Sequence, residues 1–258
     1  MRYLLCLFRA EIVKAFKIAV RYKFNTLFNI VFWAVLMLAL SHFLFHDKSG
    51  TKTWAFICSF MIWLIANNTF ISVVDAIVSE TNQGTLEQLY INSRSFFSLL
   101  FVKGCTAALF TMFQSILTFA LCFLFVRQVS LVYFAQWCSL LPFMLLSVFS
   151  LIGLGVACAS LTLRYKNMSS FYGMVSSIVF GVLTYGAVGM SKSYLFMMFF
   201  PFAKANAILQ LCMIANATMG WQTFLTIIFN DTVYLLLGYI CLLYLIKKGR
   251  QNGSLSKF

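Results

Sequence analysis

Long uncharged stretches recur along the chain, and short segments with charged or polar residues separate them. A helix that crosses the hydrocarbon core of a membrane needs roughly 20 residues with few charges. Lipid offers the backbone no hydrogen bonds, so unbroken apolar runs favour helices over the short alternating strands of a barrel. We therefore predict six spans: Thr26–Phe45, Trp54–Val74, Gly104–Val126, Gln136–Leu161, Met168–Met190 and Thr223–Ile246.

The composition supports a single membrane domain. Hydrophobic residues make up 62% of the 258 residues and charged residues 10%, and the mean hydropathy is +0.92. A soluble domain carries about 25% charged residues, so this chain lacks the polar residues to cover a water-facing surface. The predicted fold is an all-α polytopic membrane protein in which one domain fills residues 1–258.

Lysine and arginine residues are unequally distributed between the two sides of the predicted bundle. Most of the 19 lie in residues 1–25, in the connection 75–103, between the fourth and fifth spans, or in the tail 247–258. Cytoplasmic loops carry the excess of these residues, so we predict that both termini are cytoplasmic. The net charge of +13 is scattered over short loops, whereas a nucleic-acid partner requires a basic patch on one folded face.

Residues 1–25 have the pattern of a helix that lies in the membrane interface. Their apolar face comprises Leu5, Phe8, Ile12, Phe16 and Ala19, and their basic face comprises Lys14, Lys17 and Arg21. Such a helix buries its apolar side chains at the acyl boundary and directs its cations at anionic headgroups, which makes membrane lipids a partner. The alternative is a basic leader whose sole role is to set the topology.

The connection 75–103 is the long hydrophilic segment on the predicted cytoplasmic side. Gly84 breaks the chain, after which Thr85 is suited to cap a short helix, with Gln88 three residues later completing a capping box. Leu86, Leu89 and Tyr90 share one face of that helix. A helix this short has no stability of its own. It either fills a groove on another protein or packs against its own bundle.

The run from Glu80 to Leu89, followed by Ser93, Arg94 and Lys103, resembles a family signature. The signature is the E-x-x-x-G-T-L-E-Q-L motif of type-2 ABC transporter permeases, the membrane subunits of exporters for drugs, peptides, lipids or lipid-linked glycans. The resemblance extends over the whole chain through the six spans and the interfacial helix. The family often has a proline after the signature, where this chain has Asn92 and Ser93.

The resemblance implies that the connection docks on a separate ABC ATPase subunit through a coupling helix over Thr85–Ile91. The residues it assigns to this partner are Glu80, Gly84, Thr85, Leu86, Glu87, Gln88, Leu89 and Tyr90. It also implies a second permease subunit, either a copy of this chain or a similar one. The setting would be the cytoplasmic membrane of a bacterium.

The chain lacks the residues for chemistry of its own. No G-x-x-x-x-G-K-[ST] run is present, so ATP and Mg²⁺ would bind the partner ATPase. The eight cysteines form no C-x-x-C pair, and His42 and His46 are the two histidines, so we predict no metal site and no catalytic role. An intramembrane lipid-modifying enzyme, a competing hypothesis, would need a cluster of acids or histidines.

Residues 191–222 are too apolar for a free external loop and too polar for a seventh span. The resemblance implies that they enter the outer leaflet and return, because breaks in a helix are tolerated where protein or water surrounds them. The alternative is a loop that lies on the membrane surface.

Polar residues within the spans are candidates for a transport pathway: Asn67, Asn68, Gln114 and Asp231. A carboxylate such as Asp231 should face the bundle interior or water. It would bind a cationic substrate group, pair with Lys204, serve as a protonated structural group, or lie exposed near the membrane interface. In an ion-coupled carrier it would be the coupling group. For the amides the alternative is hydrogen bonding between helices. Gly153 and Gly155 are predicted to allow close helix packing.

Overall fold

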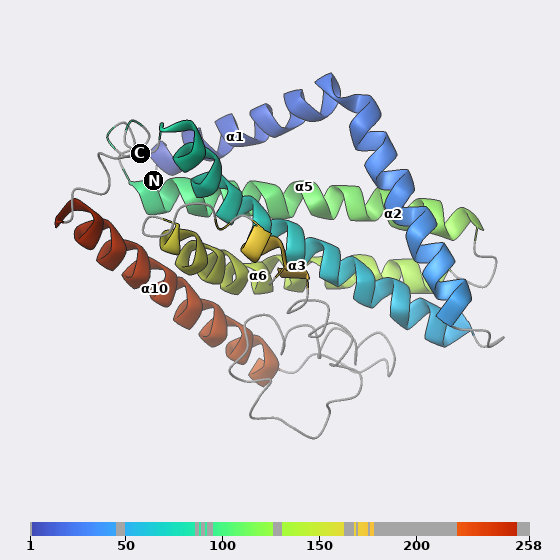
Figure 1. Ribbon diagram of the computed structural model, residues 1–258. Coiled ribbons are helices and arrows are strands. Elements are labelled where there is room, and N and C mark those ends of the chain that lie inside the picture. Colours follow the sequence, from blue (N-terminus) through green and yellow to red (C-terminus); the bar gives the residue numbers. More distant parts are fainter. Residues whose placement is uncertain are drawn as a thin grey trace.

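The computed structural model describes residues 2–44, 50–85, 88, 91, 95–125, 131–162, 168, 170–174, 176–177 and 221–251. The regular secondary structure in these residues is helical (Figure 1). The long helices are α1 (Arg2–Arg21), α2 (Lys23–Leu44), α3 (Gly50–Gln83), α5 (Phe96–Phe125), α6 (Leu131–Leu161) and α10 (Trp221–Gln251).

Five helices in the described part of the chain, α2, α3, α5, α6 and α10, are long and apolar enough to cross a membrane. The prediction of an all-helical membrane protein is therefore confirmed. The predicted fifth span, Met168–Met190, lies mostly outside the described residues, as do 191–220 and the end of the tail.

The helices extend further than the uncharged stretches that predicted them. Helix α3 continues beyond Val74 to Gln83, and α5 already begins at Phe96, so Lys103 is a helical residue. Hydropathy marks the part of a helix that lies in hydrocarbon, whereas an α-helix that leaves the hydrocarbon core can carry charges there. The connection predicted over 75–103 is therefore helical at both of its ends.

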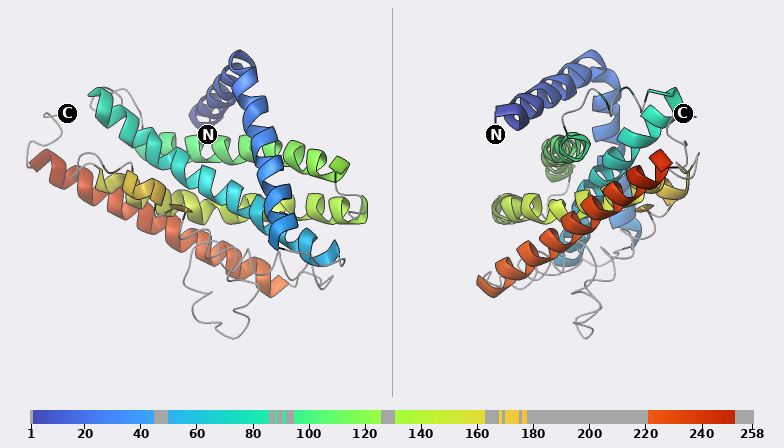
Figure 2. Two further views of the ribbon diagram at one scale, coloured as in Figure 1. Left: turned by 45° about the vertical axis from the view of Figure 1, so that its right-hand side comes forward. Right: turned by 90° about the vertical axis from the view of Figure 1, so that its left-hand side faces the viewer.

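Helix α3 lies in the middle of the bundle, where it packs against α5 and α6, and α10 packs against α6 (Figures 1 and 2). In the apolar windows of α3 and α6, 67% and 61% of the residues are buried, against 17% in α2 and 22% in α10. The central pair is thus covered by protein, while α2 and α10 present apolar faces outward. Helices α3, α5 and α6 run in alternating directions, which brings Gln83, Phe96 and Leu161 to one end of the bundle (Figure 1).

The first two helices form one bent rod with its corner at Tyr22 (Figure 1). Backbone hydrogen bonds continue through the corner, from Tyr22 N to Ile18 O at 2.9 Å and from Thr26 N to Tyr22 O at 3.0 Å. The predicted helix over 1–25 is present as α1. Three residues of its apolar stripe, Leu5, Ile12 and Phe16, are 61%, 40% and 65% exposed, whereas Phe8 and Ala19 are half-buried. Part of this stripe therefore faces away from the bundle.

Helices pack closely at Gly153 and Gly155, as predicted, and at Gly153 two helix backbones are in direct contact. A Cβ atom on Gly153 would collide with the backbone of Tyr234 in α10, and one on Gly238 would collide with the Gly153 carbonyl. Gly155 faces Val73 of α3 instead. Helix α6 therefore approaches α10 more closely than any side chain would allow, and its contact with α3 at Gly155 is tight.

Tyr172 ties the segment after α6 back to that helix. Its side chain is 2% exposed, and its hydroxyl donates a hydrogen bond to the Cys158 carbonyl at 2.9 Å. Cys158 lies in the last turn of α6, where carbonyls have no partner within the helix. The tyrosine thus satisfies one of those carbonyls and fixes the chain beside α6.

Candidate functional site

The predicted break at Gly84 is a helix cap that ends α3. Gly84 has a φ angle of 70°, which is in the left-handed region that glycine adopts without a steric penalty. Its N–H donates to Thr81 O at 3.2 Å, and the Thr85 N–H donates to Glu80 O at 3.0 Å. These two bonds are the pair that defines a Schellman motif, and they satisfy two carbonyls of the last turn.

The Glu80 side chain belongs to the same cap. The Thr85 hydroxyl donates to Glu80 Oε2 at 2.6 Å and lies 3.4 Å from the Glu80 carbonyl oxygen. The spacing E-x-x-x-G-T therefore has a physical explanation within this chain. The glutamate fastens the threonine to the last turn of α3, and the glycine supplies the reversal between them.

Most of the remaining motif lies outside the described residues, namely Leu86, Glu87, Leu89 and Tyr90. Gln88 and Ile91 are described, are helical and are exposed, with Ile91 at 72%. The predicted short helix after Thr85 is therefore consistent with these two positions. Which surface its apolar face contacts stays a prediction.

Two of the predicted pathway residues, Asn68 on α3 and Gln114 on α5, line the same small gap beside α2. Its volume is about 10 Å³, which holds one water molecule at most. Hydroxyl groups surround it, but those of Thr111 and Thr118 donate to carbonyls of their own helix, at 2.8 and 2.9 Å. In this conformation the gap is a polar contact between helices and too small for a substrate.

Asn67, the neighbouring amide, has a different environment. Its Oδ1 atom and the indole Nε1 of Trp63, one turn earlier on α3, are buried without a hydrogen-bond partner among the described residues. Trp63 meets Trp33 of α2 edge to face, with ring centroids 5.8 Å apart. A buried polar atom of this kind normally has a water or protein partner.

Asp231 lies at the contact between α10 and α6. It is 5% exposed, and its Oδ1 accepts a hydrogen bond from the backbone N–H of Ser150 at 3.1 Å. Its Oδ2 is buried without a partner in the described part of the chain. The interpretation that Asp231 lies exposed near the interface is therefore wrong, because the Gly153 contact draws α10 against the α6 backbone. Lys204, the other suggested partner, lies outside the described residues.

Three of the four candidate pathway residues thus fall into two places. Asn68 and Gln114 lie between α2, α3 and α5, whereas Asp231 lies between α6 and α10. Sequence patterns did not single out Ser150, because the group that binds Asp231 is a backbone N–H and any residue supplies one. The sequence signal for this contact is Gly153, one turn after Ser150, because a glycine in a span allows another helix to approach closely.

Comparison with family models and with curated proteins finds no match to this chain.

Proposed function

We propose that this chain is the permease subunit of an ATP-binding-cassette exporter and that it couples to a separate ATPase through Thr85–Ile91. The observation that carries the proposal is the E-x-x-x-G-T-L-E-Q-L run directly at the end of a long apolar helix. Its first part forms a hydrogen-bonded cap on α3. Its second part would then be free to project toward a partner.

The cap is suited to pass on a movement. Three hydrogen bonds join Gly84 and Thr85 to the last turn of α3, so a displacement after Thr85 would pull on the helix rather than on a loose loop. Helix α3 is 34 residues long, and its apolar window is 67% buried. Closely packed helices shift as units, so α5 and α6 would move with it.

The partner surface would be an apolar groove with basic groups at its edge. Ile91 is already exposed, and Leu86, Leu89 and Tyr90 would fill the groove while Glu87 pairs with a basic side chain. Glu80 is committed to Thr85 through one oxygen, so we assign it to the cap first. ATP and Mg²⁺ would bind the ATPase, and a second permease subunit would complete the pathway.

The proposal includes six spans, with the fifth over Met168–Met190, and a re-entrant segment within 191–222. Both termini would be cytoplasmic, in the inner membrane of a bacterium, with α1 in the interface. The exposed apolar stripe of α1 supports that location. The substrate would be amphipathic: a drug, a peptide, a lipid or a lipid-linked glycan.

Replacing both Leu86 and Leu89 with Asp tests the coupling. We expect at least a tenfold loss of ATPase co-purification, because two apolar anchors at the centre of an interface are each worth more than about 1.4 kcal/mol. The matched control is Asn82→Asp with Gln83→Asp, which adds the same charge to exposed positions in the last turn of α3. Undiminished co-purification of the Leu86 and Leu89 variant would overturn the assignment.

A second candidate is an ion-coupled carrier that uses Asp231. The observation in its favour is the buried Oδ2 atom, which has no partner in the described residues. Such a carrier would move its substrate in proteoliposomes under an ion gradient, without ATP or a second subunit. Transport of that kind by the purified chain would favour it over the exporter.

A further inference from the structure

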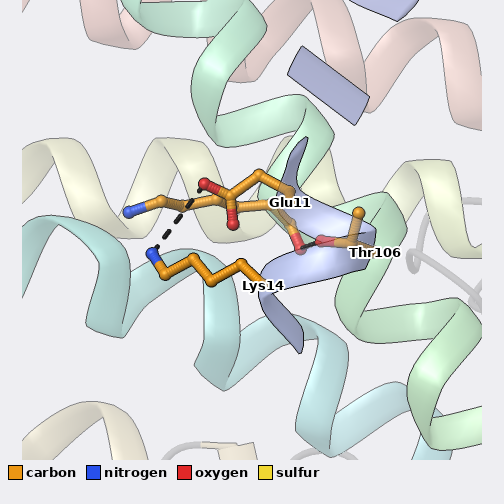
Figure 3. Close-up of polar contacts among 4 residues, drawn as sticks. Glu11, Lys14 and Thr106 are labelled. Carbon is orange, nitrogen blue, oxygen red and sulfur yellow. Dashed lines mark hydrogen bonds and ion pairs between the residues drawn. The ribbon is translucent and has the colours of Figure 1, made fainter. Parts of the chain in front are cut away.

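Helix α1 does not seal against the bundle but leaves an open cleft between itself, α3 and α5. The cleft has a volume of about 390 Å³, which is within the range of small-molecule sites. Its charged lining residues are Glu11 and Lys14 of α1, Asp75 of α3 and Lys103 of α5. Figure 3 shows Glu11 and Lys14 beside Thr106, which lines the cleft from α5.

Two of the four charges in this cleft are paired at close range, and the other two are not. Lys14 Nζ lies 3.9 Å from Glu11 Oε1, and the Glu11 side chain is 19% exposed. This is the one ion pair within the described residues, so Asp75 and Lys103 form none there. Two acids and two cations from three helices thus share a cleft in which a ligand with both signs of charge would find partners.

Hydroxyl groups add acceptors to the same cleft. The Ser79 hydroxyl donates to Asp75 O at 2.5 Å, and the Thr106 hydroxyl donates to Lys103 O at 2.9 Å. Because each proton is used within its own helix, the oxygen lone pairs remain to accept. A primary ammonium group donates three hydrogen bonds, and these oxygens together with the carboxylates are suitable acceptors.

The depth of the cleft points to a lipid headgroup. Asp75 directly follows the uncharged stretch Trp54–Val74 of α3, and Lys103 directly precedes the uncharged stretch Gly104–Val126 of α5. This pattern favours a position near the headgroups for both residues. Helix α1 covers the cleft and turns Leu5 and Phe16 outward. We propose that this cleft binds a phosphate headgroup that carries a primary amine, as in phosphatidylethanolamine, with the phosphate at Lys14 and Lys103 and the amine at Asp75 and Glu11.

Charge balance separates this headgroup from the other common ones. The four charged side chains sum to zero, so a zwitterion leaves the cleft balanced, whereas phosphatidylglycerol would bring a negative charge and no amine. Phosphatidylcholine is zwitterionic, but its quaternary nitrogen has no N–H to donate. The proposal concerns α1, α3 and α5 alone and does not depend on coupling to an ATPase.

Native mass spectrometry of the full chain, purified and supplied with one lipid at a time, tests the proposal. We expect phosphatidylethanolamine to be retained about tenfold more than phosphatidylcholine or phosphatidylglycerol, because a charged hydrogen bond is lost with either of them. Asp75→Asn should abolish that preference, and Asp75→Glu should restore it. Lys103→Gln should lower the retention of all three lipids, because each of them carries the phosphate. The matched control, Lys17→Gln, lies on the same helix as Lys14 and outside the lining of this cleft.

Equal retention of the three lipids by the unaltered chain would overturn the proposal, as would a preference that survives Asp75→Asn. Thermal unfolding in detergent identifies any variant that has not folded, and Asp75→Glu then serves as the informative substitution. Soluble phosphoethanolamine distinguishes the source of the headgroup. Displacement of the lipid by phosphoethanolamine would support the cleft as the lipid site. If phosphoethanolamine bound and no lipid were retained, the ligand would be a soluble zwitterion and the lipid assignment would be wrong.

Discussion

The α6–α10 contact and the α1–α5 contact join helices to the bundle in opposite ways. At the first, Gly153 and Gly238 bring two backbones together and Asp231 accepts from a backbone N–H. At the second, side chains hold α1 away from its neighbours and leave a cleft of about 390 Å³. One contact has no room for adjustment, and the other has room for a ligand.

The difference shows where this molecule can change without unfolding. Backbone atoms in contact cannot rotate away as side chains do, so substitutions at the α6–α10 contact must displace a whole helix. Around the cleft, the long side chains of Lys14 and Lys103 can change rotamer without moving the backbone. We therefore expect effects on stability to decrease from the first contact to the second.

Gly153→Ala should have the largest effect on stability. The added methyl group meets the Tyr234 backbone, and overpacking that side chains cannot relieve costs about 1–3 kcal/mol or more. The matched control is Gly173→Ala, where a Cβ atom meets nothing within 4 Å. Thermal unfolding in detergent measures both variants. A Gly153 variant as stable as the Gly173 variant would show that α6 and α10 do not pack backbone to backbone.

Asp231→Leu should have an intermediate effect, about 1–2 kcal/mol, because the Ser150 N–H would lose its acceptor on α10. Asp231→Asn keeps an oxygen at that position and should lie much closer to the unaltered chain. The same unfolding assay decides between them. If the two substitutions were equally costly, the hydrogen bond to Ser150 would not be what stabilises the contact.

Asp231→Asn also separates the two candidate functions. An exporter that uses the carboxylate only for packing should keep its ATP-driven transport, whereas an ion-coupled carrier would lose gradient-driven transport with the titratable group. Transport in proteoliposomes, with and without the ATPase, is the measurement.

Glu11→Gln should have the smallest effect on stability, below about 0.5 kcal/mol. It removes an ion pair of 3.9 Å in which the Lys14 side chain is 60% exposed, and pairs of this kind contribute little. The expected change in unfolding temperature is close to the error of the assay. A loss as large as that of Asp231→Leu would mean that α1 is fastened more firmly than its open cleft suggests.

Much of the fold could be predicted from the sequence because hydropathy is a local property. The apolar stretches around Ile62 and Leu151 mark helices wherever they occur in the chain. The ends of helices were harder to predict, and α3 extends more than two turns beyond Val74, the predicted end of the second span. When charged residues are used to end a span, a charged helix outside hydrocarbon is predicted as a loop, although its backbone hydrogen bonds are intact.

The candidate site divides in the same way. The Gly84 break was predictable, because a glycine after a helical stretch is the ordinary C-terminal signal. That Glu80 would fold back onto Thr85 was not, since the same residues equally suited a partner protein. Glu11 was not among the predicted site residues, although it is the one acid in the strongly basic segment 1–25.

The sequence by itself determined that this chain forms apolar helices and where α3 is interrupted, because burial in lipid and a left-handed turn each depend on residues that are neighbours in the chain. The tertiary structure decided which polar groups meet. Asp231 and Ser150 are separated by 81 positions, and Glu11 and Lys103 by still more. Their proximity arises from the packing of helices, in which glycines admit one neighbour closely and long side chains hold another apart.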